Sequence, residues 1–337
     1  MEPLKHQPGA YLSGILATWR RLYSEKSRQV NKAFLKKVLL LLVLFLALYW
    51  VESFMPGGYD WKKDFQYGRT PPEWTPWTTN IVQWAAPFGY GVIFSATVIS
   101  LALRSRQHTQ SPIPVVLAVL SLPTIWVVYY MGNLDGLGVL GLLLLPIGIP
   151  LVLMKPQVAG FAILAKKSSL IAGILWLLIT TLIWGFWPLK ILNMMMTPAW
   201  KGDYPQDISI FPWGVLLALL LVWPSRGDED LLMAAGSLAT PHLFPYHFIL
   251  LMPALGRMRW QWMLITWVIS WTPILANWLG DWAWHFGNLM SVFFWLGIYL
   301  NRKPSSMPTG DDPISYVVEK ARLIVGRVYR TKKLAEQ

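Results

Sequence analysis

Residues 38–51 read VLLLLVLFLALYWV and contain no charged side chain. A helix needs about 17–25 mostly apolar residues to cross the hydrocarbon core of a bilayer. With its flanks this run reaches that length, so it predicts a transmembrane helix over 38–55. The run follows a long polar and basic stretch, which a cleavable signal peptide would not have. We therefore interpret it as a retained first span.

Other stretches of the chain have a similar apolar character. Four more are long enough to span: 81–103, 113–130, 169–187 and 260–277. Two are shorter (211–223 and 287–300), and two are interrupted by Pro and Gly (137–165 and 231–255). Broken helices are tolerated within a bilayer where they line a cavity or pack against protein. The sequence thus predicts an all-α, polytopic membrane bundle of about 8–10 transmembrane helices, some of them broken or re-entrant.

The composition fits this class and excludes several others. Of 337 residues, 55% are hydrophobic and 14% are charged, whereas soluble proteins carry about 25% charged residues. The chain has no Cys, which excludes thiol nucleophiles, disulfides and Cys-ligated metals. It also has no phosphate-binding Gly-rich loop, kinase motif set or HExxH zinc motif. We therefore expect no cofactor and no metal.

The basic residues are distributed unequally between the two sides of the predicted bundle. If the N-terminus is inside, 23 of the 29 Lys and Arg residues fall in inner segments and five in outer ones, with Lys155 unassigned. Basic loops stay on the cytoplasmic side. We therefore predict a multi-pass protein of the cell membrane with both termini in the cytoplasm. The formal net charge of +12 then reports orientation, and no nucleic-acid partner is expected.

The chain divides into three predicted parts. Residues 1–37 and 301–337 carry apolar side chains at helical spacing and Lys or Arg on the other face. This pattern predicts amphipathic helices that bind membrane lipids at the anionic cytoplasmic leaflet. Residues 38–300 form the transmembrane domain. Its two long outer loops are predicted at 56–80 and 188–210.

Two acidic residues lie just after the first span. Asp60 and Asp64 are placed at the outer membrane face by the predicted topology. A carboxylate there can accept a proton from a hydroxyl group of a membrane-held substrate. The alternative is that both are solvated loop acids, as most loop acids are. Weaker examples of the same case are Glu73, Asp135, Asp203, Asp207 and Asp281.

One lysine lies within an apolar stretch. Lys155 belongs to LMKPQVAGFAIL (153–164) and is followed at once by a proline. A charge near the centre of a bilayer costs about 2.5–3.5 kcal/mol on insertion scales, so it usually faces protein or water. Lys155 could therefore be a cationic point in a polar cavity that meets a phosphate. Alternatively, it extends to the cytoplasmic face from a tilted span.

Polar residues also interrupt two other apolar stretches. Asn133 and Asp135 in the motif GNLDG either line a site or cap the helix that follows. His242 and His247 flank the break in TPHLFPYH, and their spacing differs from the i, i+4 pattern of a helical zinc site. They either make hydrogen bonds within a cavity or satisfy backbone carbonyls at the break.

Six motifs follow one another in an order that is informative when they are taken together. They are GGYDW (57–61), TPPEWTPW (70–77), GNLDGLGVLG (132–141), LMKPQVAGFAIL (153–164), GFWPL (185–189) and MAAGSLATPHLFPYHFILLMPAL (233–255). In this order the chain resembles the GT-C class of membrane glycosyltransferases over roughly residues 38–260. The resemblance is closest to family 87, the polyprenyl-phosphate-sugar-dependent mannosyltransferase-like group, and to small bacterial relatives of it.

The resemblance implies a multispan helical fold with its active site at the outer face. It implies that Asp60 is the general base on an acceptor hydroxyl, with Asp64 as the second choice. The donor would be a polyprenyl-phosphate-linked sugar and the acceptor a lipid or glycan. Lys155 and Gln157 of the KPQ element would lie on the donor side, with His242 nearby.

The chain departs from the family pattern in two places. The first outer loop is shorter than usual between its acid and its PP pair, and the segment between GNLDG and KPQ is compressed. A non-catalytic, lipid-binding membrane scaffold is therefore an alternative function. A small-molecule transporter ranks behind it, because the broken helices fit such a protein but no inverted repeat is visible.

Overall fold

The computed structural model describes residues 25–55, 57–71, 74–197, 204–302 and 313–314. Every regular element in these residues is a helix, and none of them forms a strand. The contacts divide the chain into two units, Met1–Leu48 and Tyr49–Gln337, which are described separately. The all-α fold class is confirmed.

The first unit contains most of helix α2 (Glu25–Glu52). Its segment Phe34–Glu52 is long and apolar enough to cross a membrane, and none of the window that passes this test is buried. An exposed apolar helix can contact lipid, because its side chains are apolar and all of its backbone hydrogen bonds are internal. The amphipathic helices predicted for 1–37 and 301–337 fall mostly outside the described residues.

Further helices with the length and composition of spans belong to the second unit. The unbroken ones are α10 (Lys167–Trp184) and the segment Trp260–Leu279, made of α15 (Trp260–Ile269), η7 (Thr272–Leu275) and α16 (Ala276–Leu279). Two bent pairs qualify together: α4 and η2 (Thr78–Phe88) with α5 (Tyr90–His108), and α6 (Ile113–Val119) with α7 and η3 (Leu122–Met131). By length and composition, the described residues thus hold three helices that could cross a membrane, or up to five if each bent pair counts as one. All five coincide with the clearest predicted spans.

The remaining apolar stretches form shorter helices, which is why fewer spans are found than the eight to ten predicted. The 137–165 stretch contains α8 (Leu137–Leu143), α9 (Ile149–Val152) and η4 (Ala159–Ala165). The 231–255 stretch contains parts of α14 (Glu229–Ser237) and η6 (Met252–Arg257), and all of η5 (Pro245–Leu250). The shorter candidates are α13 (Gly214–Ser225) and α17 (Asn288–Tyr299). Proline breaks these stretches because it lacks an N–H and clashes with the preceding turn.

The two predicted outer loops are partly helical and packed, contrary to expectation. The first contains α3 (Tyr59–Lys63) and η1 (Phe65–Tyr67), and the second begins within α11 (Trp187–Met195). Phe65 is fully buried and meets Trp74 edge-on, with ring centroids 5.7 Å apart. These segments carry enough aromatic surface to bury themselves against the bundle. The first loop is therefore a compact layer that can hold a side chain in a fixed position.

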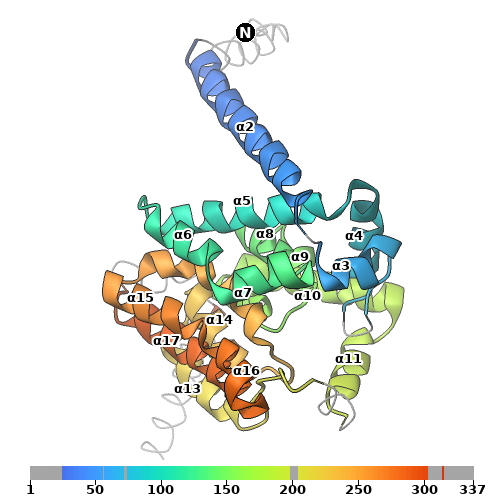
Figure 1. Cartoon of the computed structure of the whole chain (residues 1–337), viewed down its shortest axis with the longest axis vertical. Coiled ribbons are helices and arrows are strands. Elements are labelled where there is room, and N and C mark those ends of the chain that lie inside the picture. Colours follow the sequence, from blue (N-terminus) through green and yellow to red (C-terminus); the bar gives the residue numbers. More distant parts are fainter. Residues whose placement is uncertain (1–24, 56, 72–73, 198–203, 303–312, 315–337) are drawn as a thin grey trace, which may run out of the picture. The chain divides into compact units, whose positions relative to one another are not determined.

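Helix α14 lies at the centre of the second unit. Its residues from Asp230 to Ser237 are all buried, and it packs against η4, α13 and α17. At Gly236 an added Cβ would lie 2.0 Å from Cγ of Phe161, so the ring of this η4 residue contacts the α14 backbone directly. Helix α5 lies across α8 in Figure 1 and packs against it and against η6.

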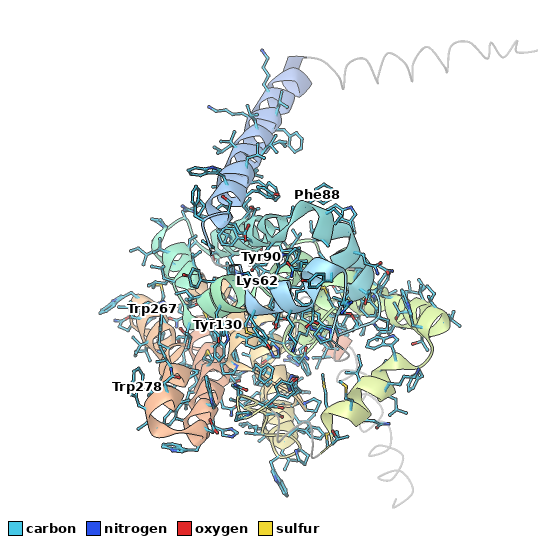
Figure 2. All side chains as sticks on the ribbon, turned by 45° about the vertical axis from the view of Figure 1, so that its right-hand side comes forward. Lys62, Phe88, Tyr90, Tyr130, Trp267 and Trp278 are labelled. Atoms are coloured by element: carbon cyan, nitrogen blue, oxygen red, sulfur yellow. The ribbon has the colours of Figure 1, made fainter. Side chains whose placement is uncertain are left out.

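The tryptophans divide into an exposed and a buried group. Trp278 projects from the periphery in Figure 2, as a membrane-interface residue should. Other exposed ones are Trp50, Trp84, Trp213 and Trp282. Trp77 and Trp187, in contrast, are buried with their ring centroids 5.1 Å apart. A position at the membrane interface thus fits only some of the tryptophans, and others belong to the core.

Candidate functional site

Asp60 is positioned by the close approach of two glycines. It lies in α3, whose N-cap Gly58 lies against Gly132, the residue that ends η3. A Cβ on Gly58 would fall 1.9 Å from the Gly132 nitrogen. Gly132 itself has φ +61°, in the left-handed region that favours glycine. Glycine at both positions lets the backbone of α3 touch the turn that leads into GNLDG.

Asn133 connects Asp60 to the next acid. The Asn133 Nδ2 donates to Asp60 Oδ2 over 2.8 Å, and Asn133 Oδ1 accepts the backbone N–H of Asp135 over 3.1 Å. Helix α8 is instead capped by Gly136, with no side-chain hydrogen bond. The interpretation of Asn133 and Asp135 as simple helix caps is therefore wrong. Both side chains are buried, and Asn133 holds the Asp60 carboxylate in place.

Lys155 is enclosed by protein. It is only 7% exposed, and its Nζ lies 3.5 Å from Asp135 Oδ2 and 3.3 Å from Tyr246 Oη. The ammonium also sits 4.5 Å from the centroid of the Trp74 ring, within the range of a cation–π contact. The alternative in which Lys155 extends to the cytoplasmic surface is wrong. The buried Lys155 ammonium instead forms an ion pair with Asp135, next to the rings of Trp74 and Tyr246.

His247 lies on the other side of Asp135. Its Nδ1 accepts the backbone N–H of Phe244 over 3.1 Å, so in the neutral ring the proton is on Nε2. That Nε2 lies 3.8 Å from Asp135 Oδ2, near but beyond direct hydrogen-bond distance. The histidine thus adds a polar donor to the Asp135–Lys155 pair. It is not satisfied by a backbone carbonyl, as one interpretation of the sequence had it.

His242 pairs with an acid that sequence analysis ranked low. Its Nδ1 lies 2.8 Å from Asp207 Oδ2, while Asp207 Oδ1 accepts the N–H groups of Leu243 and Ser209. Burial raises the pKa of Asp207, but these hydrogen bonds outweigh it, and the pKa lies below its ordinary value. Asp207 is therefore a carboxylate that orients the His242 ring. The two histidine rings are 6.0 Å apart, centroid to centroid.

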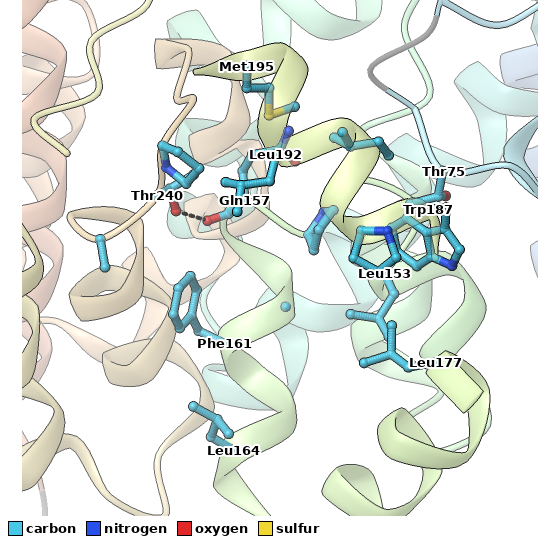
Figure 3. A pocket seen from close by; sticks show the side chains of 16 residues that line it. Thr75, Leu153, Gln157, Phe161, Leu164, Leu177, Trp187, Leu192, Met195 and Thr240 are labelled. Carbon is cyan, nitrogen blue, oxygen red and sulfur yellow. Dashed lines mark hydrogen bonds between the residues drawn. The ribbon is translucent and has the colours of Figure 1, made fainter. Parts of the chain in front are cut away.

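Gln157 belongs to a different feature, a cavity of about 430 Å³. Figure 3 shows the cavity between the 153–164 segment, α11 and the turn at Thr240, whose hydroxyl donates to the Gln157 backbone oxygen over 2.6 Å. Its residues are almost all apolar: Thr75, Leu153, Pro156, Gln157, Gly160, Phe161, Leu164, Leu177, Trp187, Pro188, Ile191, Leu192, Met195, Ala239, Thr240 and Pro241. By contrast, the void that reaches Asp135, Lys155 and His247 measures only about 10 Å³.

The structure therefore gathers most of the predicted site residues. Asp60, Asn133, Asp135, Lys155 and His247 form one run of contacts, which we call the polar network. Asp64 caps the end of α3, and its backbone N–H donates to the Asp60 carbonyl oxygen over 3.0 Å. Among the described residues, no hydrogen bond or ion pair joins the Asp64 side chain to the network. Glu73 and Asp203 lie outside the described residues. No group of three or more His, Asp or Glu residues within the described part is placed to hold a metal ion.

Three contributors were missed or underrated: Trp74, Asp207 and Tyr246. Tyr246 stands in the same TPHLFPYH break as the two histidines, so its neighbourhood was a usable signal. Asp207 and His242 are 35 positions apart, and Lys155 and Tyr246 are 91 apart. No local periodicity reports contacts over such separations.

A second charged group lies well away from the polar network. Arg104, near the end of α5, contacts Asp230 at 2.8 Å, and Arg257 contacts Asp228 and Asp230. At the other end of α5, Tyr90 packs against Trp61, the neighbour of Asp60, with ring centroids 5.5 Å apart. Arg104 follows Tyr90 by fourteen positions in the helix, which corresponds to about 21 Å along the axis. We call Arg104, Asp228, Asp230 and Arg257 the ionic cluster.

No family model, curated protein or solved structure matches this chain. The case for a function therefore rests on the geometry of the polar network and the cavity.

Proposed function

We propose that the protein is a membrane glycosyltransferase of the GT-C type. It would move one sugar from a polyprenyl-phosphate donor to a hydroxyl of a lipid or glycan acceptor at the outer face of the cell membrane. One observation carries the proposal: Asp60, a half-buried acid that follows the first predicted span, belongs to the same polar network as Lys155. An acid and a cation in one helical bundle are the two charges that this transfer needs.

The proposed reaction uses these groups as follows. The Asp60 carboxylate accepts the proton of the acceptor hydroxyl, whose oxygen forms a bond to the anomeric carbon of the sugar. The bond from that carbon to the phosphate oxygen breaks, and the electron pair leaves with the lipid phosphate. Lys155 gives up its ion pair with Asp135 and pairs with the phosphate instead, which neutralises this leaving group. Asn133 holds Asp60 Oδ2 throughout.

The position of the ionic cluster supports an outer location for this chemistry. The cluster gathers Arg104 and Arg257, together with Lys166 through its contact to Glu229. Because basic residues gather on the cytoplasmic side, the cluster end of α5 is the inner end in the proposed orientation. The Asp60 end of the polar network, which lies near Tyr90 at the other end of α5, then faces outward, and both termini of the chain are cytoplasmic.

The test compares two neighbouring acids in the purified protein with a labelled polyprenyl-phosphate sugar. Asp60→Asn should lower kcat by roughly 10²–10⁴-fold, the usual contribution of a general base. Asp64→Asn, four residues along the same segment, should stay close to the wild-type rate. If the Asp60 variant keeps full activity, the base assignment is wrong. If only the Asp64 variant loses it, the base is Asp64.

A second candidate, a non-catalytic lipid-binding scaffold, is favoured by one observation. Lys155 is already paired with Asp135, and the void beside them is about 10 Å³. A donor phosphate has to displace Asp135 before it reaches the ammonium. Binding of lipid without turnover of any polyprenyl-phosphate sugar, in wild-type protein reconstituted in membranes, would select this function.

A further inference from the structure

The cavity of about 430 Å³ carries a ligand preference that differs from that of the polar network. Its volume falls within the range of about 300–1,000 Å³ that is usual for small-molecule sites. No Asp, Glu, Lys or Arg is found among its described lining residues. Lys155 adjoins Pro156 in sequence, but its side chain points to Asp135 and Tyr246 rather than into the cavity.

The polar contribution to the cavity comes mainly from Gln157. The residue is 6% exposed, and its Oε1 has no hydrogen-bond partner within the described part of the chain. The hydroxyls of Thr75 and Thr240, in contrast, are already hydrogen-bonded to backbone oxygens of Met154 and Gln157. Leaving a buried acceptor unsatisfied costs about 1–3 kcal/mol. Oε1 has less than 1 Å² of accessible surface, so the Gln157 side chain has to turn its amide oxygen into the cavity before a ligand can donate a hydrogen bond to it and recover that cost.

The surroundings of the cavity indicate where its ligand comes from. The cavity is walled by Leu177 of α10 and by Ile191 and Leu192 of α11. Helix α10 has the length and composition of a membrane span, and its other side chains are largely exposed and apolar. The site therefore adjoins the hydrocarbon region of the bilayer, and an aliphatic chain can enter it without leaving an apolar environment.

From these observations we propose that the cavity binds an uncharged lipid alcohol, with its chain among the apolar side chains and its hydroxyl donating to Gln157 Oε1. A phosphate does not fit, because burying an anion requires a paired cation or several donors. The inference does not rest on sugar transfer, since a scaffold would bind the same lipid. It adds a site for which the proposed reaction gave no occupant.

The test uses hexadecanol carrying a photoreactive diazirine in its chain, and purified protein in detergent with no sugar donor. Crosslinks should map to α11 and to residues 153–164. Leu192→Trp fills the cavity and should reduce crosslinking at least tenfold. Leu189→Trp is the matched control, since both leucines lie on α11 and are similarly exposed (48% and 41%), but only Leu192 lines the cavity. Equal labelling of the two variants would overturn the site.

Two further arms test the chemistry of the head group. Gln157→Leu should weaken the binding of hexadecanol by about 2–10-fold, as expected for the loss of one hydrogen bond, and should leave the binding of hexadecane unchanged. Hexadecyl phosphate should compete at least tenfold more weakly than hexadecanol. If the phosphate competes as well or better, the site is for a lipid phosphate and the proposal fails. Asp60→Asn should bind hexadecanol like wild type, so failure of the proposed transferase and failure of this site are separately visible.

Discussion

At the level of single residues, Asp230 is a buried carboxylate held between two arginines. It is 2% exposed and lies 2.8 Å from both Arg104 and Arg257. Burial raises its pKa, but the two guanidinium groups outweigh this, so the pKa lies below the ordinary value of 3.8. Conversely, burial lowers the pKa of Arg257, but its contacts with Asp228 and Asp230 raise it overall. Each group in the ionic cluster thus favours the charged form of its neighbours.

This arrangement predicts how stability depends on pH. Because the folded pKa of Asp230 is below the unfolded one, its stabilising contribution is complete above about pH 4 and is lost as the pH falls further. Asp230→Asn should lower the free energy of unfolding by about 1.5–3 kcal/mol near neutral pH, the range for hydrogen bonds to charged groups, since Arg104 keeps Glu229 and Arg257 keeps Asp228 as partners. The deficit relative to wild type should shrink in acid. Denaturant unfolding in detergent across this range measures both effects.

Lys166 provides the matched control for Asp230. Its side chain is 61% exposed and contacts Glu229 at 2.9 Å. Solvent-exposed ion pairs contribute about 0–1 kcal/mol, so Lys166→Met should remain within that range of wild type. Similar losses for Lys166→Met and Asp230→Asn would show that the cluster stabilises by total charge rather than by buried pairing.

At the level of elements, the Gly58–Gly132 contact joins α3 to η3. The Cβ of Gly58→Ala would meet backbone atoms, which cannot move aside, so α3 must separate from η3. We expect a loss of about 1–3 kcal/mol, typical of overpacking, and a matching fall in any activity that needs Asp60 beside Asn133. Gly173→Ala in α10 is the control, since its Cβ meets only the ends of two flexible side chains, Ile163 at 3.2 Å and Ile149 at 4.0 Å. Thermal unfolding of Gly58→Ala and Gly173→Ala measures the two losses of stability, and equal stability of the two variants contradicts the prediction.

The same elements show what sequence could and could not foresee. Crossing a bilayer imposes a length and composition that are visible locally, so the long apolar runs were predicted correctly. The 81–103 stretch was predicted as one helix, yet the chain bends by 109° between Phe88 and Tyr90. Gly89 takes φ +76° there and Pro87 precedes it. The members of the polar network could be singled out from the sequence because polar groups stand out in apolar runs, whereas their pairing depends on tertiary contacts.

At the level of the whole molecule, the ionic cluster and the polar network connect different sets of elements. The ionic cluster ties together the C-terminal part of α5, the start of α14 and the end of η6. The polar network joins α3, the GNLDG turn and the 153–164 segment. Its Asp60 end lies beside Trp61, which packs on Tyr90, about 21 Å along α5 from Arg104. Buried charges are costly unless paired, so two separate paired groups fix how the broken helices between them are aligned. The function proposed here requires that these two groups face opposite sides of the membrane.

The absence of native cysteine makes this orientation directly measurable. Single cysteines introduced at exposed positions can be labelled in intact cells with a membrane-impermeant maleimide. Lys62→Cys and Lys190→Cys should react from outside, whereas Lys166→Cys and Arg259→Cys should react only after the membrane is permeabilised. All four side chains are exposed, so differences report sidedness rather than burial. The reverse pattern would place the polar network in the cytoplasm, where a polyprenyl-phosphate sugar presented at the outer face could not reach Asp60.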